Sequence, residues 1–166
     1  MGFEAFRVEL RGGKTSYQDV DAAIRKLPHI RPDRESVPIE GSTFYVMDDG
    51  RHVIEMELMD SPIRVSCRFT LCHPPSIDGA FLALVHDLMH RFGMEARICD
   101  DVRPEDSGPF SVEKFAEFSA TVQRYIGSRR QEWVAAFGVQ PLAATTNEVY
   151  QRIILPRCEQ GVTQPT

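Results

Sequence analysis

Groups that bind metals or transfer protons follow several predicted strands of this chain. The residues concerned are Asp48, Asp49, His73, Cys99, Asp100 and Asp101. Carboxylate, imidazole and thiolate side chains are common ligands of divalent metals, and the first two also act as general acids and bases. If these residues meet, they predict a ligand- or metal-dependent enzyme whose site lies at the edge where the strands end.

Whether these residues meet depends on the directions of the strands. A right-handed crossover through a helix would make strands 4–10 and 43–47 parallel. Strands 63–72 and 94–98 would then end at the same edge, where open sheets usually bind ligands. The alternative is local: each aspartate accepts hydrogen bonds from turn amides, as in Asp48-Asp49-Gly50, and the cysteines merely end strands.

A second candidate site is the acidic segment after the last predicted strand. It contains Asp101, Glu105 and Asp106, preceded by Asp100 and interrupted by one base, Arg103. Complementary charge speeds association, so Asp101, Glu105 and Asp106 are candidates for binding a basic protein partner. The alternative is that this short charged run is simply solvated.

His86 and His90 stand four residues apart on a predicted helix, a spacing at which two imidazoles can share a metal. The apolar stripe of that helix, which includes Phe81, Leu84 and Leu88, lies on the opposite side. Both imidazoles are therefore expected to face solvent, and the chain is expected to hold no metal and no cofactor.

Composition disfavours several classes of function. The 166 residues carry 19 Lys and Arg against 24 Asp and Glu, a net charge of −5, whereas nucleic-acid binding needs a concentrated basic face. No apolar stretch is long enough to span a membrane, and the first residues lack the pattern of a signal peptide. The four cysteines include no Cys-x-x-Cys motif. We expect a cytoplasmic protein with reduced thiols that binds neither nucleic acid nor membrane.

Hydrophobic periodicity predicts the elements that would position these groups. Alternation with a period of two predicts strands at 4–10, 43–47, 52–59, 63–72 and 94–98. Helical spacing predicts one helix that Thr15 caps and that ends before Pro28, and a second that Ser76 caps and that ends at Gly93. The stretch 28–41 is expected to be a surface connection.

The last third of the chain is predicted to be helical. Ser111 is expected to cap one helix, and Gly127 to separate it from a shorter helix that ends at Gly138. The segment 147–155 is periodic but fits either a helix or a strand.

The hairpin of 52–59 and 63–72 allows its register to be argued. The apolar residues are even-numbered in the first strand and odd-numbered in the second, so opposed residues must sum to an odd number. A two-residue turn at Asp60-Ser61 meets this condition. It places Glu57 opposite Arg64, and Glu55 diagonal to Arg68.

The order β-α-β-β-β-α-β followed by helices predicts an α+β fold, a two-layer sandwich with a mixed or antiparallel sheet. Residues 1–155 are expected to form one domain, with the sheet core in 1–101 and a helical part in 108–155, and 156–166 to be a tail. The charged face of the sheet either meets water or is partly covered by the C-terminal helices.

Two main functions follow. The first is a small acidic cytosolic, non-enzymatic protein-binding module, comparable in size and charge to bacterial immunity or adaptor proteins. The alternative is the enzyme with its site at the strand ends. A homo-oligomeric structural protein is a third possibility.

Overall fold

The computed structural model describes residues 5–34 and 36–138. Within this range the chain has an α+β fold with one antiparallel sheet. The strands are β1 (Ala5–Arg11), β2 (Ile30–Pro32), β3 (Ser42–Asp48), β4 (Val53–Met59), β5 (Arg64–Thr70) and β6 (Glu95–Ile98). The helices are α1 (Tyr17–Ile24), α2 (Ile77–Phe92) and α3 (Phe115–Phe137), with short 3-10 helices η1 (Pro104–Asp106) and η2 (Val112–Lys114).

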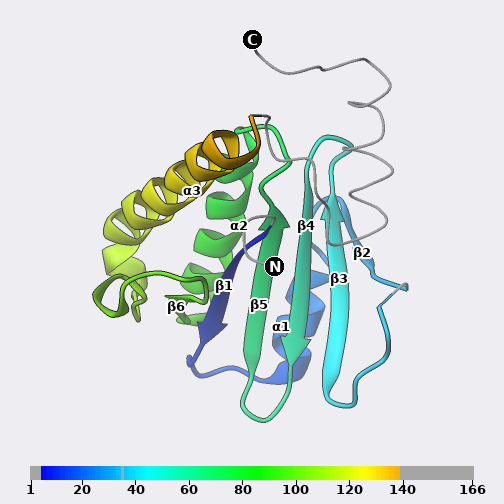
Figure 1. The fold of residues 1–166 in the computed structure, drawn as a ribbon. Coiled ribbons are helices and arrows are strands. Elements are labelled where there is room, and N and C mark those ends of the chain that lie inside the picture. The colour runs from blue at the N-terminus through cyan, green and yellow to red at the C-terminus, as the bar shows by residue number, and fades with distance from the viewer. Residues whose placement is uncertain (1–4, 35, 139–166) are drawn as a thin grey trace.

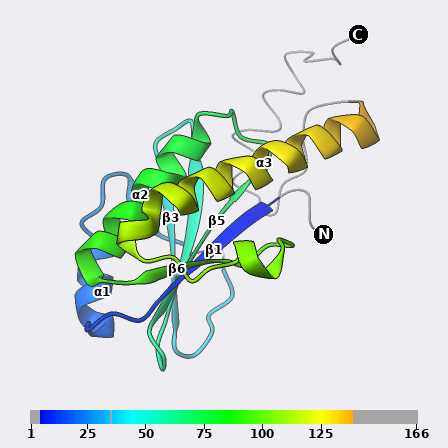
Figure 2. The same ribbon diagram turned by 90° about the vertical axis from the view of Figure 1, so that its left-hand side faces the viewer.

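The helices gather on one side of the sheet. In Figure 1, α1 and α2 lie behind the strands, and α3 lies beside α2 next to the β6 edge. The view turned by 90° shows α3 crossing over α2 (Figure 2). Among the described residues no helix covers the other face, which we call the outer face of the sheet. None of the described helices is both long enough and apolar enough to cross a membrane.

The core lies between the sheet and α2, as the alternation predicts. Phe6, Val8 and Leu10 of β1 are fully buried, whereas the intervening Arg7 is exposed. Ile54, Val65 and Ile98 lie on the apolar faces of the alternating strands, and all three belong to one buried cluster with Phe81 and Leu88 of the apolar stripe of α2. The alternation in the strands therefore identifies the buried face of the sheet correctly. Each of these side chains contributes roughly 1.5–3 kcal/mol through burial.

Three phenylalanines join the central strands to α2. The ring centroid of Phe6 on β1 lies 6.2 Å from that of Phe69 on β5 and 6.3 Å from that of Phe81 on α2. Phe69 and Phe81 are 4.8 Å apart. Tilted and edge-on aromatic pairs at these distances add about 0.5–1.5 kcal/mol each beyond burial. This cluster therefore holds the helix layer to the middle of the sheet.

The predicted parallel arrangement of the first strands is wrong. The strand order is β2-β3-β4-β5-β1-β6, and every pair is antiparallel, so β1 and β3 run in opposite directions and are not neighbours. The cause is β2, a three-residue edge strand in the stretch expected to be a surface connection. Because β2 pairs with β3 as a hairpin, it reverses the direction in which β3 runs. As a result β3, β5 and β6 end at one edge and β1 ends at the other.

The hairpin of β4 and β5 has the predicted parity but a different register. Opposed residues sum to an odd number, with Glu55 opposite Arg68 and Glu57 opposite Ser66. The predicted pairing of Glu57 with Arg64 is wrong by two residues, because the connection spans 60–63 and not only Asp60-Ser61. Pro62 lies in this connection, and a proline has no N–H to contribute to a strand ladder.

Helix boundaries agree with the sequence at their ends more than at their starts. Gly93 and Gly138 terminate α2 and α3 in the left-handed conformation, as predicted. The cap of α1 is Ser16, whose Oγ accepts the N–H of Asp19, and not Thr15. Helix α3 continues through Gly127 without a break. The ambiguous segment 147–155 and the tail 156–166 lie outside the described residues.

Two arginines of α3 fasten it to the rest of the fold. Both terminal nitrogens of Arg130 donate to the carboxylate of Asp78 at the start of α2, at 2.7 Å. Arg129 binds the carboxylate of Asp100, after β6, and donates to the carbonyl of Ala5 in β1 at 2.9 Å. These side chains are mostly buried, so charge pairing orients α3 across α2 and the β1–β6 side of the sheet.

The close contact between the turn after β1 and the end of α2 can be tested. Gly12 and Gly13 share a φ of +79°, but a Cβ on Gly13 would lie 2.2 Å from the carbonyl oxygen of Phe92, whereas a Cβ on Gly12 would meet nothing within 4 Å. We expect Gly12→Ala to lower the free energy of unfolding by about 1–2 kcal/mol through backbone strain alone. Gly13→Ala should cost about 2–5 kcal/mol because the clash is added. Urea unfolding measures both, and equal losses would contradict the close approach of this turn to α2.

Candidate functional site

The strand-end residues divide into two groups in the structure. Asp48, Asp49 and His73 lie around the start of β4, since His73 accepts the N–H of Val53 and Asp49 lies in the turn before it. The second group, Cys99, Asp100 and Asp101, follows β6 on the far side of β1. Strands β5 and β6 are separated by β1, which places them about 10 Å apart. Within the described part of the chain, no three metal-ligating side chains come together.

His73 has a structural role. It is 3% exposed, and its Nε2 accepts the N–H of Val53 at 3.0 Å. Its Nδ1 lies 2.8 Å from the carbonyl oxygen of Thr70, to which it donates. Both ring nitrogens therefore serve the backbone and join the end of β5 to the start of β4. Cys72 is buried beside Thr70, with Sγ 2.7 Å from Oγ1.

The residues after β6 are also engaged locally. Asp100 pairs with Arg129 of α3, although burial raises the pKa of its carboxyl. Cys99 is partly buried, and burial together with the charge of Glu9 raises the pKa of its thiol. A protonated thiol is a poor metal ligand. Asp101 is exposed.

The acidic segment is largely neutralised by arginines. Asp106 pairs with Arg103 at 2.7 Å and with Arg124 at 3.0 Å, and it accepts the hydroxyl of Tyr125. Glu105 is exposed and lies 3.6 Å from Arg103. Of the three residues expected to bind a partner, Asp106 thus fixes its own loop to α3, and Asp101 and Glu105 face solvent.

The two helical histidines face solvent, as predicted. His86 and His90 are exposed and their rings stack with centroids 6.1 Å apart. His86 also contacts the ring of Phe115, which packs against the core. The pair thus lies over the start of α3.

A different group at the same edge is connected by hydrogen bonds through one imidazole. Nδ1 of His52 lies 2.9 Å from a carboxylate oxygen of Asp49, and Nε2 lies 2.8 Å from Oγ of Ser76. Asp49 comes from the turn after β3, His52 directly precedes β4, and Ser76 directly precedes α2. We call this group the Asp49–His52–Ser76 relay. Such an order of carboxylate, imidazole and hydroxyl is the arrangement that activates a serine in acyl-transfer enzymes.

Backbone amides of the turn stabilise the ionised carboxylate of Asp49. Its carboxylate also accepts the backbone N–H groups of Arg51 at 2.9 Å and His52 at 2.7 Å. Burial alone would raise the pKa of Asp49, but the hydrogen bonds from His52 and Arg51 outweigh it and lower the pKa to about 2. Both aspartates accept amides of this turn, as the local alternative expects, since Asp48 likewise accepts the N–H of Gly50. An ionised Asp49 can only accept hydrogen bonds, so Nδ1 of His52 carries the proton.

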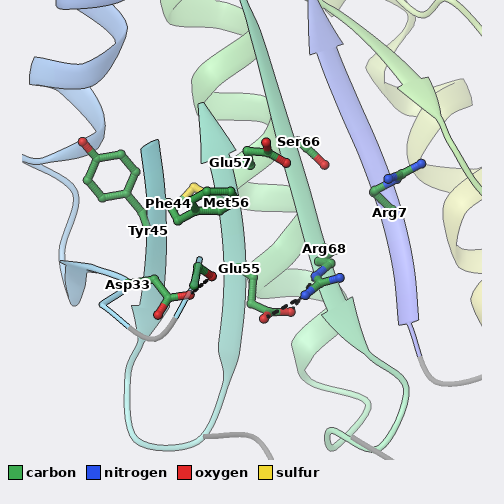
Figure 3. A pocket seen from close by; sticks show the side chains of 10 residues that line it. Arg7, Asp33, Phe44, Tyr45, Glu55, Met56, Glu57, Ser66 and Arg68 are labelled. Atoms are coloured by element: carbon green, nitrogen blue, oxygen red, sulfur yellow. Dashed lines mark hydrogen bonds and ion pairs between the residues drawn. The ribbon is translucent and has the colours of Figure 1, made fainter. Parts of the chain in front are cut away.

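The outer face of the sheet holds a polar groove of about 140 Å³ (Figure 3). It is lined by Arg7, Asp33, Ser36, Phe44, Tyr45, Glu55, Met56, Glu57, Ser66 and Arg68. Nε of Arg68 donates to Glu55 at 2.8 Å, while Glu57 points toward Ser66 of the neighbouring strand (Figure 3). We call this depression the outer groove.

The carboxylates of the outer face differ in their partners. Glu9 pairs with Arg11 and Arg64, and Glu55 pairs with Arg68. Glu57 is half-buried and accepts a hydrogen bond from Ser42 at 2.8 Å, but no cation pairs with it among the described residues. Glu57 is therefore a carboxylate of the outer groove that no cation neutralises among the described residues.

Three features were not predicted from the sequence. They are the role of His52, the hydrogen bond between Ser76 and His52, and the lack of a cation beside Glu57 among the described residues. Ser76 was expected to cap α2, but its side chain makes no cap hydrogen bond because it meets His52. The spacing of Asp49 and His52 across one tight turn is the signal that could have paired them. The isolation of Glu57 follows from the two-residue difference in register, which no local pattern shows.

Comparisons with known protein families, with curated proteins and with solved structures found no match to this chain. The class of protein therefore has to be argued from the site alone.

The loss of stability at acidic pH tests whether the hydrogen bonds of this turn lower the pKa of Asp49. A carboxyl whose pKa falls from 3.8 to about 2 on folding stabilises the fold above pH 4, and this contribution is lost as the pH falls through about 2. We expect wild type to lose stability steadily between pH 4 and pH 2. Asp49→Asn removes the titrating group, so its unfolding midpoint should change less over the same interval. Thermal unfolding at several pH values measures this, and parallel pH profiles for the two proteins would contradict the assignment.

Proposed function

We propose that this chain is a protein-binding module that recognises a basic segment of its partner at the outer groove. The observation that carries the proposal is Glu57, a half-buried carboxylate without a cationic partner among the described residues. Binding of this kind requires no catalytic step.

The charges of the outer face favour a cationic partner. Desolvating a carboxylate costs free energy unless hydrogen bonds and an opposite charge compensate. Glu9 and Glu55 have that compensation within the chain, whereas among the described residues Glu57 accepts a side-chain hydrogen bond from Ser42 and pairs with no cation. A lysine or arginine side chain would supply the missing charge and a charge-assisted hydrogen bond.

The size of the outer groove fits a side chain better than a cofactor. Pockets for small-molecule ligands usually measure about 300–1,000 Å³, and the outer groove measures about 140 Å³. Most of its walls come from the adjacent antiparallel strands β1, β3, β4 and β5, and Asp33 and Ser36 come from the connection after β2. The site therefore suits the end of one long side chain presented by a neighbouring surface.

The acidic segment is a weaker candidate for the same task. Asp106 is already paired with two arginines, and Glu105 lies near Arg103. A partner would have to compete with these internal pairs, so Asp101, Glu105 and Asp106 would steer a basic partner rather than hold it.

The setting that we propose is the cytoplasm. Cys67, Cys72 and Cys99 are free thiols, and burial raises the pKa of Cys67 to about 12. The net charge of −5 supports a protein partner over nucleic acid or an anionic membrane surface.

Removal of one charge tests the proposal. We expect a short lysine-rich peptide to shift the backbone NMR signals of β4 and β5, and a matched glutamate-rich peptide to leave them unchanged. Glu57→Gln should weaken binding of the lysine-rich peptide about 3- to 10-fold, because a partly exposed ion pair contributes about 1 kcal/mol.

The matched control is Glu95→Gln, which removes the same charge from an exposed position on β6. It should leave the affinity within about twofold of wild type. Equal weakening by both substitutions would mean that only net charge matters, and the proposal would then be wrong.

A further inference from the structure

The Asp49–His52–Ser76 relay has a feature that structural pairing alone does not require: its terminal serine is exposed at the surface. Ser76 is exposed, whereas His52, to which it is bonded, is 8% exposed. A molecule in solution can therefore reach Oγ of Ser76, while the imidazole behind it is shielded from water. In acyl-transfer sites the nucleophile and its base are arranged in this way.

The hydroxyl of Ser76 also does not make the N-cap hydrogen bond that its position before α2 would favour. A serine before a helix usually accepts a backbone N–H of the first turn. Here Ser76 makes no such bond, and the N–H groups of Ile77 and Asp78 donate instead to Pro74 and Pro75. Its hydroxyl is directed to Nε2 of His52.

The protonation pattern of the imidazole follows from its two partners. The carboxylate of Asp49 accepts from Nδ1, so in the neutral ring Nε2 carries a lone pair and accepts the proton of Ser76. Two separate segments supply the three groups, the β3–β4 turn with Asp49 and His52 and the residue before α2, and a buried histidine joins them. We infer that Ser76 is the nucleophile of an acyl-transfer site for small esters, with His52 as general base and Asp49 as the positioning residue. This activity goes beyond the proposed binding function and involves other residues.

The dipole of α2 favours negative charge near Ser76, although the N–H groups of Ile77 and Asp78 are already bonded to Pro74 and Pro75. Ser76 immediately precedes this 16-residue helix, whose N-terminal amides favour negative charge. Gly79 in the first turn is exposed, and a Cβ placed there would meet nothing within 4 Å. Open space therefore lies beside the first turn of α2 at Gly79, where an acyl group bound at Ser76 could extend.

The reaction balances with water as the only co-reactant. The Ser76 proton moves to Nε2 of His52 while Oγ bonds to the acyl carbon of the ester. The ester C–O bond then breaks, and the leaving alkoxide takes the proton from Nε2. Water, deprotonated by the same nitrogen, next attacks the acyl-serine, which releases the carboxylic acid and restores the Ser76 hydroxyl.

The test uses a fluorophosphonate, which reacts with activated serines, on the full wild-type chain. Peptide mapping by mass spectrometry should locate one adduct, on Ser76. Because this site is read on the unaltered protein, the result does not depend on whether a variant folds. Absence of an adduct on Ser76, or adducts spread over several serines at similar rates, would overturn the inference.

Variants then separate an activated serine from a merely exposed one. His52→Gln should slow labelling of Ser76 about 100-fold or more, since general-base assistance contributes about 10²–10⁴-fold. Asp49→Asn should slow it as well, and both should slow hydrolysis of 4-nitrophenyl acetate in parallel. The control is Ser128→Ala, which removes an exposed hydroxyl on α3 that bonds only to Glu132 and should leave both rates unchanged. Labelling that is indifferent to His52→Gln in a protein with wild-type circular dichroism would overturn the relay.

Discussion

The contact on which the rest of this structure depends is the meeting of Phe6, Phe69 and Phe81. It joins β1 to β5 and α2, which come much later in the sequence, and it fixes which face of the sheet is covered. Because side chains alternate along a strand, burying one face dictates that the intervening polar residues all point to the other. The outer groove with Glu57 is thus a consequence of the apolar packing on the opposite face of the sheet. The same packing holds α2 against the sheet, and Ser76 directly precedes this helix.

The fold was predictable where one face of an element is buried and the other is not. Val65 and Cys67 in β5 and the stripe around Phe81 in α2 show this, because burial of tens of square ångströms per side chain outweighs local preferences. The prediction failed where burial is slight. Strand β2 has three residues and ends in a proline, so it carries no alternating pattern, yet it decides the direction of β3. The same limit applies to Gly127, because its intrinsic cost in a helix of about 1 kcal/mol is outweighed by contacts elsewhere in α3. These are the buried side chains before it, such as Val122 and Ile126, and the ion pairs of Arg129 and Arg130 after it.

The candidate site was less predictable, for a related reason. The edge at which β3 and β5 end was expected to carry functional residues, and Asp49 does lie there. The partner of Asp49 is His52, which the alternation placed in the strand 52–59 and marked for no chemistry, and Ser76 has the sequence of an ordinary cap. Sequence periodicity places elements to within a residue or two, whereas a hydrogen bond requires atoms within about 3 Å. His73, which sequence alone made prominent, instead holds two backbone segments together.

The position of β1 between β5 and β6 has a consequence for how the chain folds. Leu10 pairs with Val65 on one side and with Ala96 on the other, whereas β3, β4 and β5 pair with their neighbours in sequence. Closing such long loops costs entropy before any contact is gained, so topologies of this kind fold slowly. Until β1 inserts, one side of β5 presents unpaired backbone groups, the kind of edge at which chains associate. The rate at which the N-terminal strand docks therefore sets how long a newly made molecule stays vulnerable to aggregation.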